Sequence, residues 1–139
     1  MKRNRIKQPP LEKNGRVHLQ PQSDMERPDE CHPVFSFEYM VSDFDVDKCE
    51  KNDRANLAVT LLKLSKLTWA QIKGAHRRGL GFEKIERKDI KTGIPQCITP
   101  EVQLIAFRFS GKKPMVGYRL KRTFYIIWLD RNFSLYDHG

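Results

Sequence analysis

Long apolar runs and paired cysteines are both missing from this 139-residue chain. No stretch approaches the roughly 18 apolar residues that a membrane-spanning helix needs, and the basic start from Met1 to Pro10 lacks the apolar core of a signal peptide. The three cysteines, Cys31, Cys49 and Cys97, are odd in number and widely spaced, which indicates reduced thiols rather than disulfides or a zinc site. We therefore expect a cytoplasmic protein with no membrane partner.

The chain also lacks the loops that commonly hold phosphates or metal ions. Gly79-Leu80-Gly81 is too short for a glycine-rich phosphate-binding loop. Six acidic residues lie between Glu38 and Asp53, but they lack the alternating oxygen ligands, central glycine and final glutamate of a calcium loop. We interpret them as a solvated acidic turn, and the sequence predicts neither a metal site nor a cofactor.

Positive charge, by contrast, is abundant. The chain has 26 Lys and Arg residues against 17 Asp and Glu residues, a formal net charge of +9. From Arg54 to Gly139 the balance is 17 against 6, a local excess of +11. Such asymmetry favours a phosphate backbone as partner, with RNA as the first candidate. The alternative is a basic surface that serves solubility alone.

The length suits one domain, and its beginning has the composition of an arm. Residues 1–33 contain five prolines among charged residues and show no apolar period. We expect this basic arm to contribute little to the core. Residues 34–139 carry the patterns of a single folded domain.

Two helices are expected in the middle of the chain. Three leucines at helical spacing predict an amphipathic helix over about 53–66. Thr68 and Gln71 have the spacing of a capping box, so a second helix is predicted to begin at Trp69 and to end near Gly79. The short link between the two predicts an αα-hairpin.

Strands are predicted on both sides of this hairpin. Valine and aromatic residues predict a first strand over 34–40, and three apolar runs predict strands over 102–109, 115–120 and 124–129. A turn signal at 110–113 separates the first two of these three. The last run is nearly continuous, as in a central strand that is covered on both faces.

The expected fold is therefore α+β. Its order is a strand, an αα-hairpin, an irregular connection over 80–100 and a three-stranded antiparallel meander. We expect the strand over 34–40 to pair with the meander, and both helices to pack on one face of the sheet.

The C-terminal third combines arginine-bearing strands with a polar tail: Phe107-Arg108-Phe109, Val116-Gly117-Tyr118-Arg119, the run 124–129, Asp130-Arg131 and Tyr136-Asp137-His138. This part resembles the RelE/ParE toxin superfamily, in element order over 34–139 and in motif over 104–138. The superfamily has a strand, a helical hairpin and a three-stranded antiparallel ending. Arginines stand on several of its strands, and its tail often carries Tyr or His.

The resemblance implies one of two activities. RelE-like members cut messenger RNA on the ribosome, whereas ParE-like members block DNA gyrase and hydrolyse nothing. Both are usually neutralised by an antitoxin protein that covers the basic face. RNA or the ribosome, and an antitoxin, are thus the expected partners.

Metal-free RNA cleavage needs a base for the 2′-hydroxyl, a cation for the phosphate and an acid for the 5′-oxygen. Arginine suits the phosphate, because its planar fork binds two oxygens and stays charged. Arg108, Arg119 and Arg131 are the candidates, and we expect Arg108 and Arg119 to approach each other across the 110–113 turn. The resemblance makes Arg119 the more important of the two. Solvated strand arginines are the alternative.

Two tail residues are candidates for proton transfer. Histidine as a residue type can transfer protons near neutral pH, which makes His138 a candidate, and Tyr136 is a phenol at a position where some relatives carry an acid. The alternatives are a disordered terminal histidine and a packed aromatic ring.

Further basic residues are expected to contact the nucleic-acid backbone. His76, Arg77 and Arg78 also suit the negative C-terminal end of the second helix, which is the alternative account of them. The predicted contact residues are His76, Arg77, Arg78, Lys84, Arg87, Lys88, Lys112, Lys113, Lys121 and Arg122.

Three hypotheses of function remain open. The first is a toxin-like RNA-binding protein that acts on mRNA or the translation machinery, as a metal-free endoribonuclease of a toxin–antitoxin system. The second is a non-catalytic module that binds nucleic acid or a protein through the same face. The third is a structural protein whose apolar strands form an oligomer interface.

Overall fold

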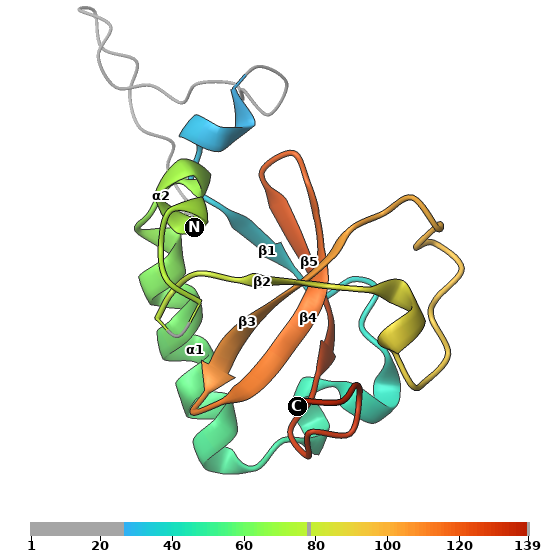
Figure 1. Cartoon of the computed structure of the whole chain (residues 1–139). Coiled ribbons are helices and arrows are strands. Elements are labelled where there is room, and N and C mark those ends of the chain that lie inside the picture. The colour runs from blue at the N-terminus through green and yellow to red at the C-terminus, as the bar shows by residue number, and fades with distance from the viewer. Residues whose placement is uncertain (1–26, 78, 139) are drawn as a thin grey trace, which may run out of the picture.

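The computed structural model describes residues 27–77 and 79–138 of the chain. Its centre is a mixed sheet with the strand order β1-β5-β4-β3-β2 (Figure 1). The strands are β1 (Val34–Ser36), β2 (Glu83–Ile85), β3 (Leu104–Ser110), β4 (Lys113–Leu120) and β5 (Thr123–Leu129). Two helices, α1 (Lys51–Ser65) and α2 (Trp69–Lys73), lie between β1 and β2 in the sequence.

The predicted α+β class is confirmed, but the sheet has five strands instead of the four expected. The additional strand, β2, lies inside the stretch 80–100 that we expected to be irregular. Its three residues are too few to show an alternating pattern in the sequence. The first strand joins the sheet as expected, and it runs parallel to β5, so the sheet is mixed rather than antiparallel.

The capping box at the start of α2 is confirmed. The Thr68 hydroxyl accepts a hydrogen bond from the Gln71 backbone N–H at 3.2 Å, and the Gln71 side chain accepts one from the Thr68 N–H at 2.9 Å. The predicted end near Gly79 is wrong, because the helix stops at Lys73. Gly74 follows directly, and glycine is the poorest helix former after proline.

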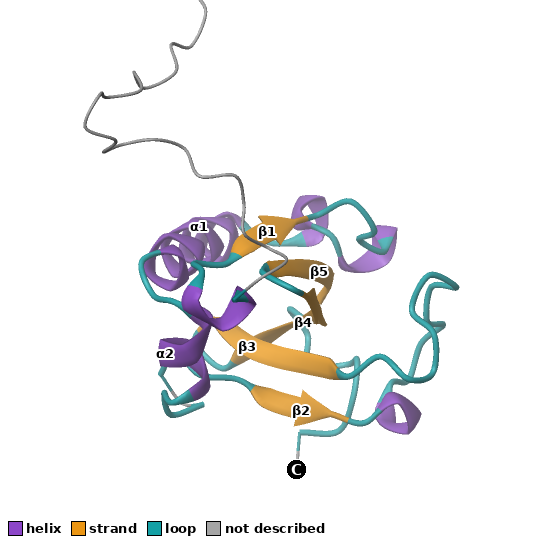
Figure 2. Cartoon of the chain, turned by 90° about the horizontal axis from the view of Figure 1, so that it is seen from above, coloured by secondary structure: helices purple, strands orange, loops and turns teal. Residues whose placement is uncertain are grey.

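Both helices lie on the same side of the sheet (Figure 2). Leu57 and Leu64 of α1, with Trp69 and Ile72 of α2, belong to a core that they share with Phe107 and other sheet residues. This core is fully apolar at its centre and closes the first face of the sheet.

The second face of the sheet is covered by loops and by the C-terminal tail. Ile98 of the loop after β2 and Leu135 of the tail are buried against Val116 and Trp128. Strand β5 therefore has a core on each face, as its continuous apolar run predicts. A bulge between β4 and β5 places Ile127 and the next residue on this second face together.

Residues 27–33, which we had assigned to the arm, are packed against the domain. Asp29 accepts hydrogen bonds from Lys73 of α2 at 2.9 Å and from Arg119 of β4. The backbone carbonyl of Cys31 accepts a bond from the Trp69 N–H at 3.0 Å. Residues 27–33 are thus hydrogen-bonded to the domain, whereas residues 1–26 lie outside the described residues, so the arm as a whole stays a prediction.

A buried carboxylate fixes α1 to the turn between β3 and β4. Asp53 accepts hydrogen bonds from the Ser110 hydroxyl and from the Lys113 ammonium, each at 2.8 Å, and is 5% exposed. Burial by itself raises the pKa of Asp53, but the bonds from Lys113 and Ser110 outweigh it and hold this pKa below its usual range. The turn that carries Lys112 is therefore held in place by charge and hydrogen bonds.

Acid should weaken this connection. Because the folded-state pKa of Asp53 is lowered, its stabilisation is present above the unfolded value near 4 and is lost as the pH falls through the folded value. We expect Asp53→Asn to cost about 2 kcal/mol of unfolding free energy at pH 7 and progressively less below pH 4. Urea denaturation of wild type and variant from pH 7 to pH 3 measures this difference. A difference that stays constant over this range contradicts the assignment.

Candidate functional site

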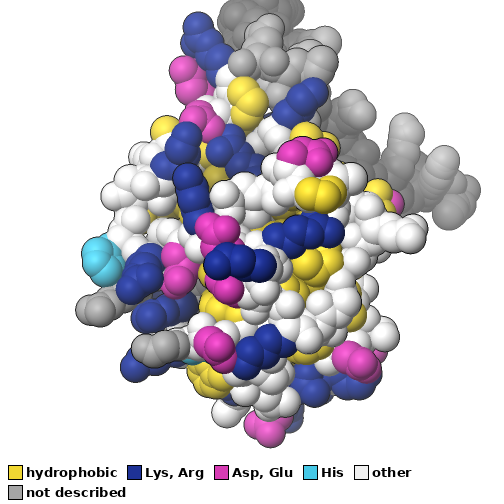
Figure 3. All heavy atoms as spheres, turned by 45° about the vertical axis from the view of Figure 1, so that its right-hand side comes forward, with side chains coloured by type: hydrophobic (Ala, Val, Ile, Leu, Met, Phe, Trp, Pro, Cys, Tyr) yellow, Lys and Arg dark blue, Asp and Glu magenta, His cyan; other side chains and the backbone are white. Residues whose placement is uncertain are grey.

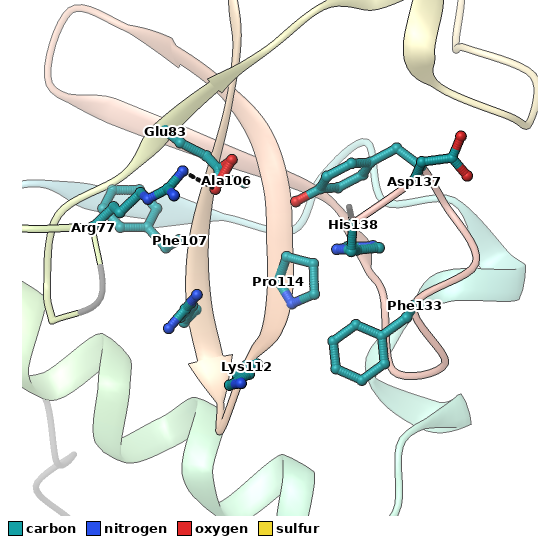
Figure 4. Close-up of a pocket in the computed structure, with 11 residues that line it drawn as sticks. Arg77, Glu83, Ala106, Phe107, Lys112, Pro114, Phe133, Asp137 and His138 are labelled. Atoms are coloured by element: carbon teal, nitrogen blue, oxygen red, sulfur yellow. Dashed lines mark hydrogen bonds and ion pairs between the residues drawn. The ribbon is translucent and has the colours of Figure 1, made fainter.

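A cavity of about 620 Å³ opens on the second face of the sheet, beside the turn between β3 and β4 (Figure 4). The sheet and its hairpin supply one wall, and the C-terminal tail supplies the other. Its lining combines cations, acids and aromatic rings: Arg77, Glu83, Ala106, Phe107, Arg108, Lys112, Pro114, Phe133, Tyr136, Asp137 and His138.

Arg108 is the cation that the sheet directs into this cavity. It lies on β3 opposite Pro114 of β4, and it shares the second face with Ala106 because alternate residues of a strand point the same way. Its side chain is half-buried, and it has no hydrogen bond or ion pair among residues 27–77 and 79–138. A guanidinium that is partly removed from water and has no protein partner is a ready site for an anion.

The two acids of the lining are each balanced by a cation. Glu83 accepts from Arg77 at 3.3 Å, and Asp137 pairs with Lys91. Lys112 is exposed on the turn and adds a further positive charge beside Arg108. The cavity therefore keeps an excess of positive charge, carried by Arg108 and Lys112.

The C-terminal tail is ordered by a buried aspartate that follows β5. Asp130 is fully buried, and its carboxylate accepts the backbone N–H groups of Ser134 at 2.8 Å and Leu135 at 3.0 Å. The same carboxylate lies 3.2 Å from Nε2 of His138. This contact orients the ring and leaves Nδ1 as the nitrogen available to a ligand. The alternative of a disordered terminal histidine does not apply to His138, because its ring contacts Asp130.

Tyr136 lines the cavity on the side formed by the C-terminal tail, and it is 8% exposed. Its ring lies against the His138 ring, with centroids 4.1 Å apart. Burial raises the pKa of Tyr136 far above its usual value, and the negative charges of Glu83 and Asp130 raise it further. Its hydroxyl therefore stays protonated at neutral pH and is available as a hydrogen-bond donor, not as a base.

Arg108 also lines a second cavity, of about 300 Å³, on its other side. This one lies between α1 and the β3–β4 turn, and Lys63 of α1 is its second cation. Arg108 thus separates two neighbouring hollows, each with a lysine at its rim.

Five of the residues that the sequence nominated meet in the larger cavity: Arg77, Arg108, Lys112, Tyr136 and His138. The sequence placed them on a helix end, a strand, a turn and the tail. The fold brings them together because the tail returns over the second face of the sheet.

The expected approach of Arg119 to Arg108 is wrong. Arg108 lies opposite Pro114, whereas Arg119 lies opposite Phe124 at the far end of β4. Arg119 lies five positions after Pro114 along the strand, about 17 Å at 3.4 Å per residue, and an odd separation puts their side chains on opposite faces.

Arg119 is instead bound into the helix side of the sheet. Its guanidinium bonds to Asp29 and to the carbonyl of Lys121, and it lies 4.3 Å from the ring centroid of Trp69. The Asp29 pKa is lowered by its hydrogen bonds from Lys73 and Arg119. These contacts join residues 27–33 to the domain.

The other nominated basic residues lie outside the cavity. Four of them have bonds to other parts of the fold: Arg131 to the Asp43 carbonyl, Lys113 to Asp53, Arg87 to the Ile98 carbonyl and Arg122 to the His32 carbonyl. Lys84, Lys88, His76 and Lys121 are exposed and line neither cavity. Arg78 lies outside the described residues.

Charges of both signs cover the face that Figure 3 shows. Lys and Arg side chains alternate there with Asp and Glu instead of forming a continuous basic surface. The excess of +11 after Asp53 therefore does not by itself locate a binding face. The cavity around Arg108 is a more specific indication.

Several lining or supporting residues were not among the site residues predicted from the sequence, and Asp130, Phe133 and Glu83 are three of them. Asp130 was noted only as part of a motif, although an aspartate directly after a strand is a common acceptor for N–H groups a few residues on. Phe133 and Glu83 gave no signal, because their place in the cavity depends on the return of the tail and on the short strand β2.

Comparison with known proteins yields no relative: no protein family, no curated protein and no solved structure matches the chain. Within residues 27–77 and 79–138, no group of three or more His, Cys, Asp or Glu side chains could hold a metal ion. No helix in the same ranges is long and apolar enough to cross a membrane.

Proposed function

We propose that this protein binds RNA through the cavity around Arg108 and cleaves it without a metal ion. The observation that carries the proposal is the guanidinium of Arg108. It is half-buried, faces the cavity and has no partner among the described residues. A phosphodiester supplies two anionic oxygens that match this fork, and Lys112 adds charge beside it.

The lining offers a group for each part of the reaction. His138, held by Asp130, accepts the proton of the 2′-hydroxyl through Nδ1 in its neutral form. The 2′-oxygen then bonds to phosphorus, and the bond from phosphorus to the 5′-oxygen breaks. Arg108 stabilises the additional negative charge on the phosphate. Tyr136, which stays protonated, donates to the departing 5′-oxygen, and the products are a cyclic phosphate and a 5′-hydroxyl.

The resemblance to the RelE/ParE superfamily directs the proposal to mRNA or the translation machinery as target. The element order β1, α1, α2, then β3, β4 and β5 is the order that the resemblance implies, and β2 is an addition to it. An antitoxin protein that covers the cavity is the corresponding partner.

A non-catalytic RNA-binding module is the second candidate. The raised pKa of Tyr136 favours this module, because a phenol that holds its proton so firmly is a poor general acid for the departing 5′-oxygen. Shortening of purified RNA in the presence of a chelator separates the two candidates. Binding without shortening selects the module.

Binding to single-stranded RNA should depend on salt. If Arg108 and Lys112 each neutralise a phosphate, the log of the association constant should fall with the log of salt concentration with a slope of about −1.4, since each contact on a single strand adds about 0.7. Fluorescence anisotropy titrations over a salt range of about 50 to 200 mM measure this slope. A flat profile would mean that the positive charge serves solubility alone.

A further inference from the structure

Phe133 has a backbone conformation that phenylalanine seldom adopts. Its φ is +56°, in the left-handed region that favours glycine and asparagine. The residue lies in the turn that follows Asp130, where its N–H bonds back to the Asp130 carbonyl at 3.4 Å. A turn of this kind is formed at lower cost by asparagine or glycine.

Burial of the Phe133 side chain does not offset the cost of its left-handed backbone conformation. The Phe133 side chain is 43% exposed and belongs to neither of the two cores. Its ring lies nearly perpendicular to the His138 ring, with centroids 5.2 Å apart, and otherwise lines the cavity. A strained and exposed aromatic residue at a cavity is a candidate for function.

The position of the ring relative to the cations suits a nucleotide. Phe133 and His138 project from the tail on one side of the cavity, and Lys112 comes from the β3–β4 turn on another (Figure 4). An anionic group at Arg108 and Lys112 would thus have an open aromatic face nearby. Aromatic rings of this kind stack on bases that are not paired.

We propose that Phe133 is a stacking platform for one nucleobase of a single-stranded RNA whose phosphate lies at Arg108. This inference rests on the proposed function and goes further, because it selects unpaired RNA and assigns base contact to a residue distinct from the phosphate-binding cations. A duplex is excluded from this site, since its bases already stack on each other.

The test compares two probes and four proteins. The probes are a short oligouridylate and an abasic ribose-phosphate oligomer of the same length, so that only the first can stack. The proteins are wild type, Phe133→Asn, Phe133→Tyr and Phe37→Asn. Phe37 is a matched control, because it is 45% exposed and lies in the segment after β1, outside the cavity.

Phe133→Asn should weaken oligouridylate binding about 10-fold or more and leave abasic binding unchanged. Its thermal midpoint should be equal to or higher than that of wild type, because asparagine tolerates the left-handed region. Phe133→Tyr should bind both probes like wild type, and so should Phe37→Asn. This pattern separates lost stacking from lost structure.

Four results would overturn the inference. Equal weakening of both probes by Phe133→Asn would make Phe133 a residue that positions the tail. Unchanged oligouridylate binding in that variant would show that the Phe133 ring does not contact RNA, and contact with a protein partner would then account for its exposure. A wild-type protein that binds both probes equally and in a salt-dependent way would retain the proposed function without the stacking, whereas binding to neither would remove both.

Discussion

Replacing Arg108 by alanine is expected to lower the rate of RNA cleavage roughly 100- to 1,000-fold, the usual cost of one oriented donor to developing charge. The expectation follows from its half-buried guanidinium, which faces the cavity with no partner among the described residues. Arg108→Lys should restore only part of the rate, because lysine keeps the charge but loses the two-pronged contact. Single-turnover cleavage of an end-labelled RNA measures the effect. If the protein binds RNA without cleaving it, RNA affinity should fall in the order wild type, Arg108→Lys, Arg108→Ala.

Arg119→Ala is the matched control for this experiment. It removes the same side chain from the neighbouring strand, but at the end of β4 that is remote from the cavity. We expect near wild-type cleavage together with a lower thermal midpoint, because Arg119 holds Asp29 and lies over the Trp69 ring. A folded Arg119→Ala protein without activity, beside an active Arg108→Ala protein, would contradict the assignment.

Replacing Gly117 by alanine should be the most damaging single-atom addition in the sheet. A Cβ at this position would overlap the Tyr125 carbonyl oxygen and lie 2.9 Å from the Tyr125 carbonyl carbon and 3.2 Å from the Ile126 Cα. These are backbone atoms of the next strand, at the bulge, so no side chain can move aside. We expect a loss of about 3 kcal/mol, the upper end for overpacking, and a fall of roughly 10 °C in the thermal midpoint.

Gly93→Ala is the comparison for this change. A Cβ at Gly93 meets no atom within 4 Å, so the same substitution there should leave stability unchanged or raise it slightly, by about 0.4–1 kcal/mol. Thermal unfolding of both variants decides the matter. Equal midpoints for the two would show that β4 and β5 are further apart than described.

Local signals predicted the local parts of this fold. Three signals depend only on residues that are close in the sequence: the capping box at Thr68, the continuous apolar run of β5 and the turn at 110–113. Each of them predicts the structure of its own segment. The strand β2 was missed for the converse reason. Its three residues have no period of their own and pair only because β3 offers a free edge.

The site was predictable in its residue types and not in its geometry. Counting back from the turn at 110–113 places Arg108 opposite Met115, and a bulge after Arg108 moves its partner to Pro114, so either register excludes a contact with Arg119. The order of the tail, by contrast, depends on Asp130 being buried beneath it, and burial of a carboxylate is set by the whole fold. Tyr136 and His138 reach the cavity only through that interaction.

Ultraviolet crosslinking of a single-stranded RNA to the intact protein, with the linked peptides identified by mass spectrometry, tests most directly whether RNA lies in the cavity around Arg108. The account predicts crosslinks in the β3–β4 turn near Lys112 and in the tail near Phe133, and their loss in Arg108→Ala. Crosslinks confined to the outer side of α1 or to β1, or crosslinks that persist unchanged in Arg108→Ala, would contradict it.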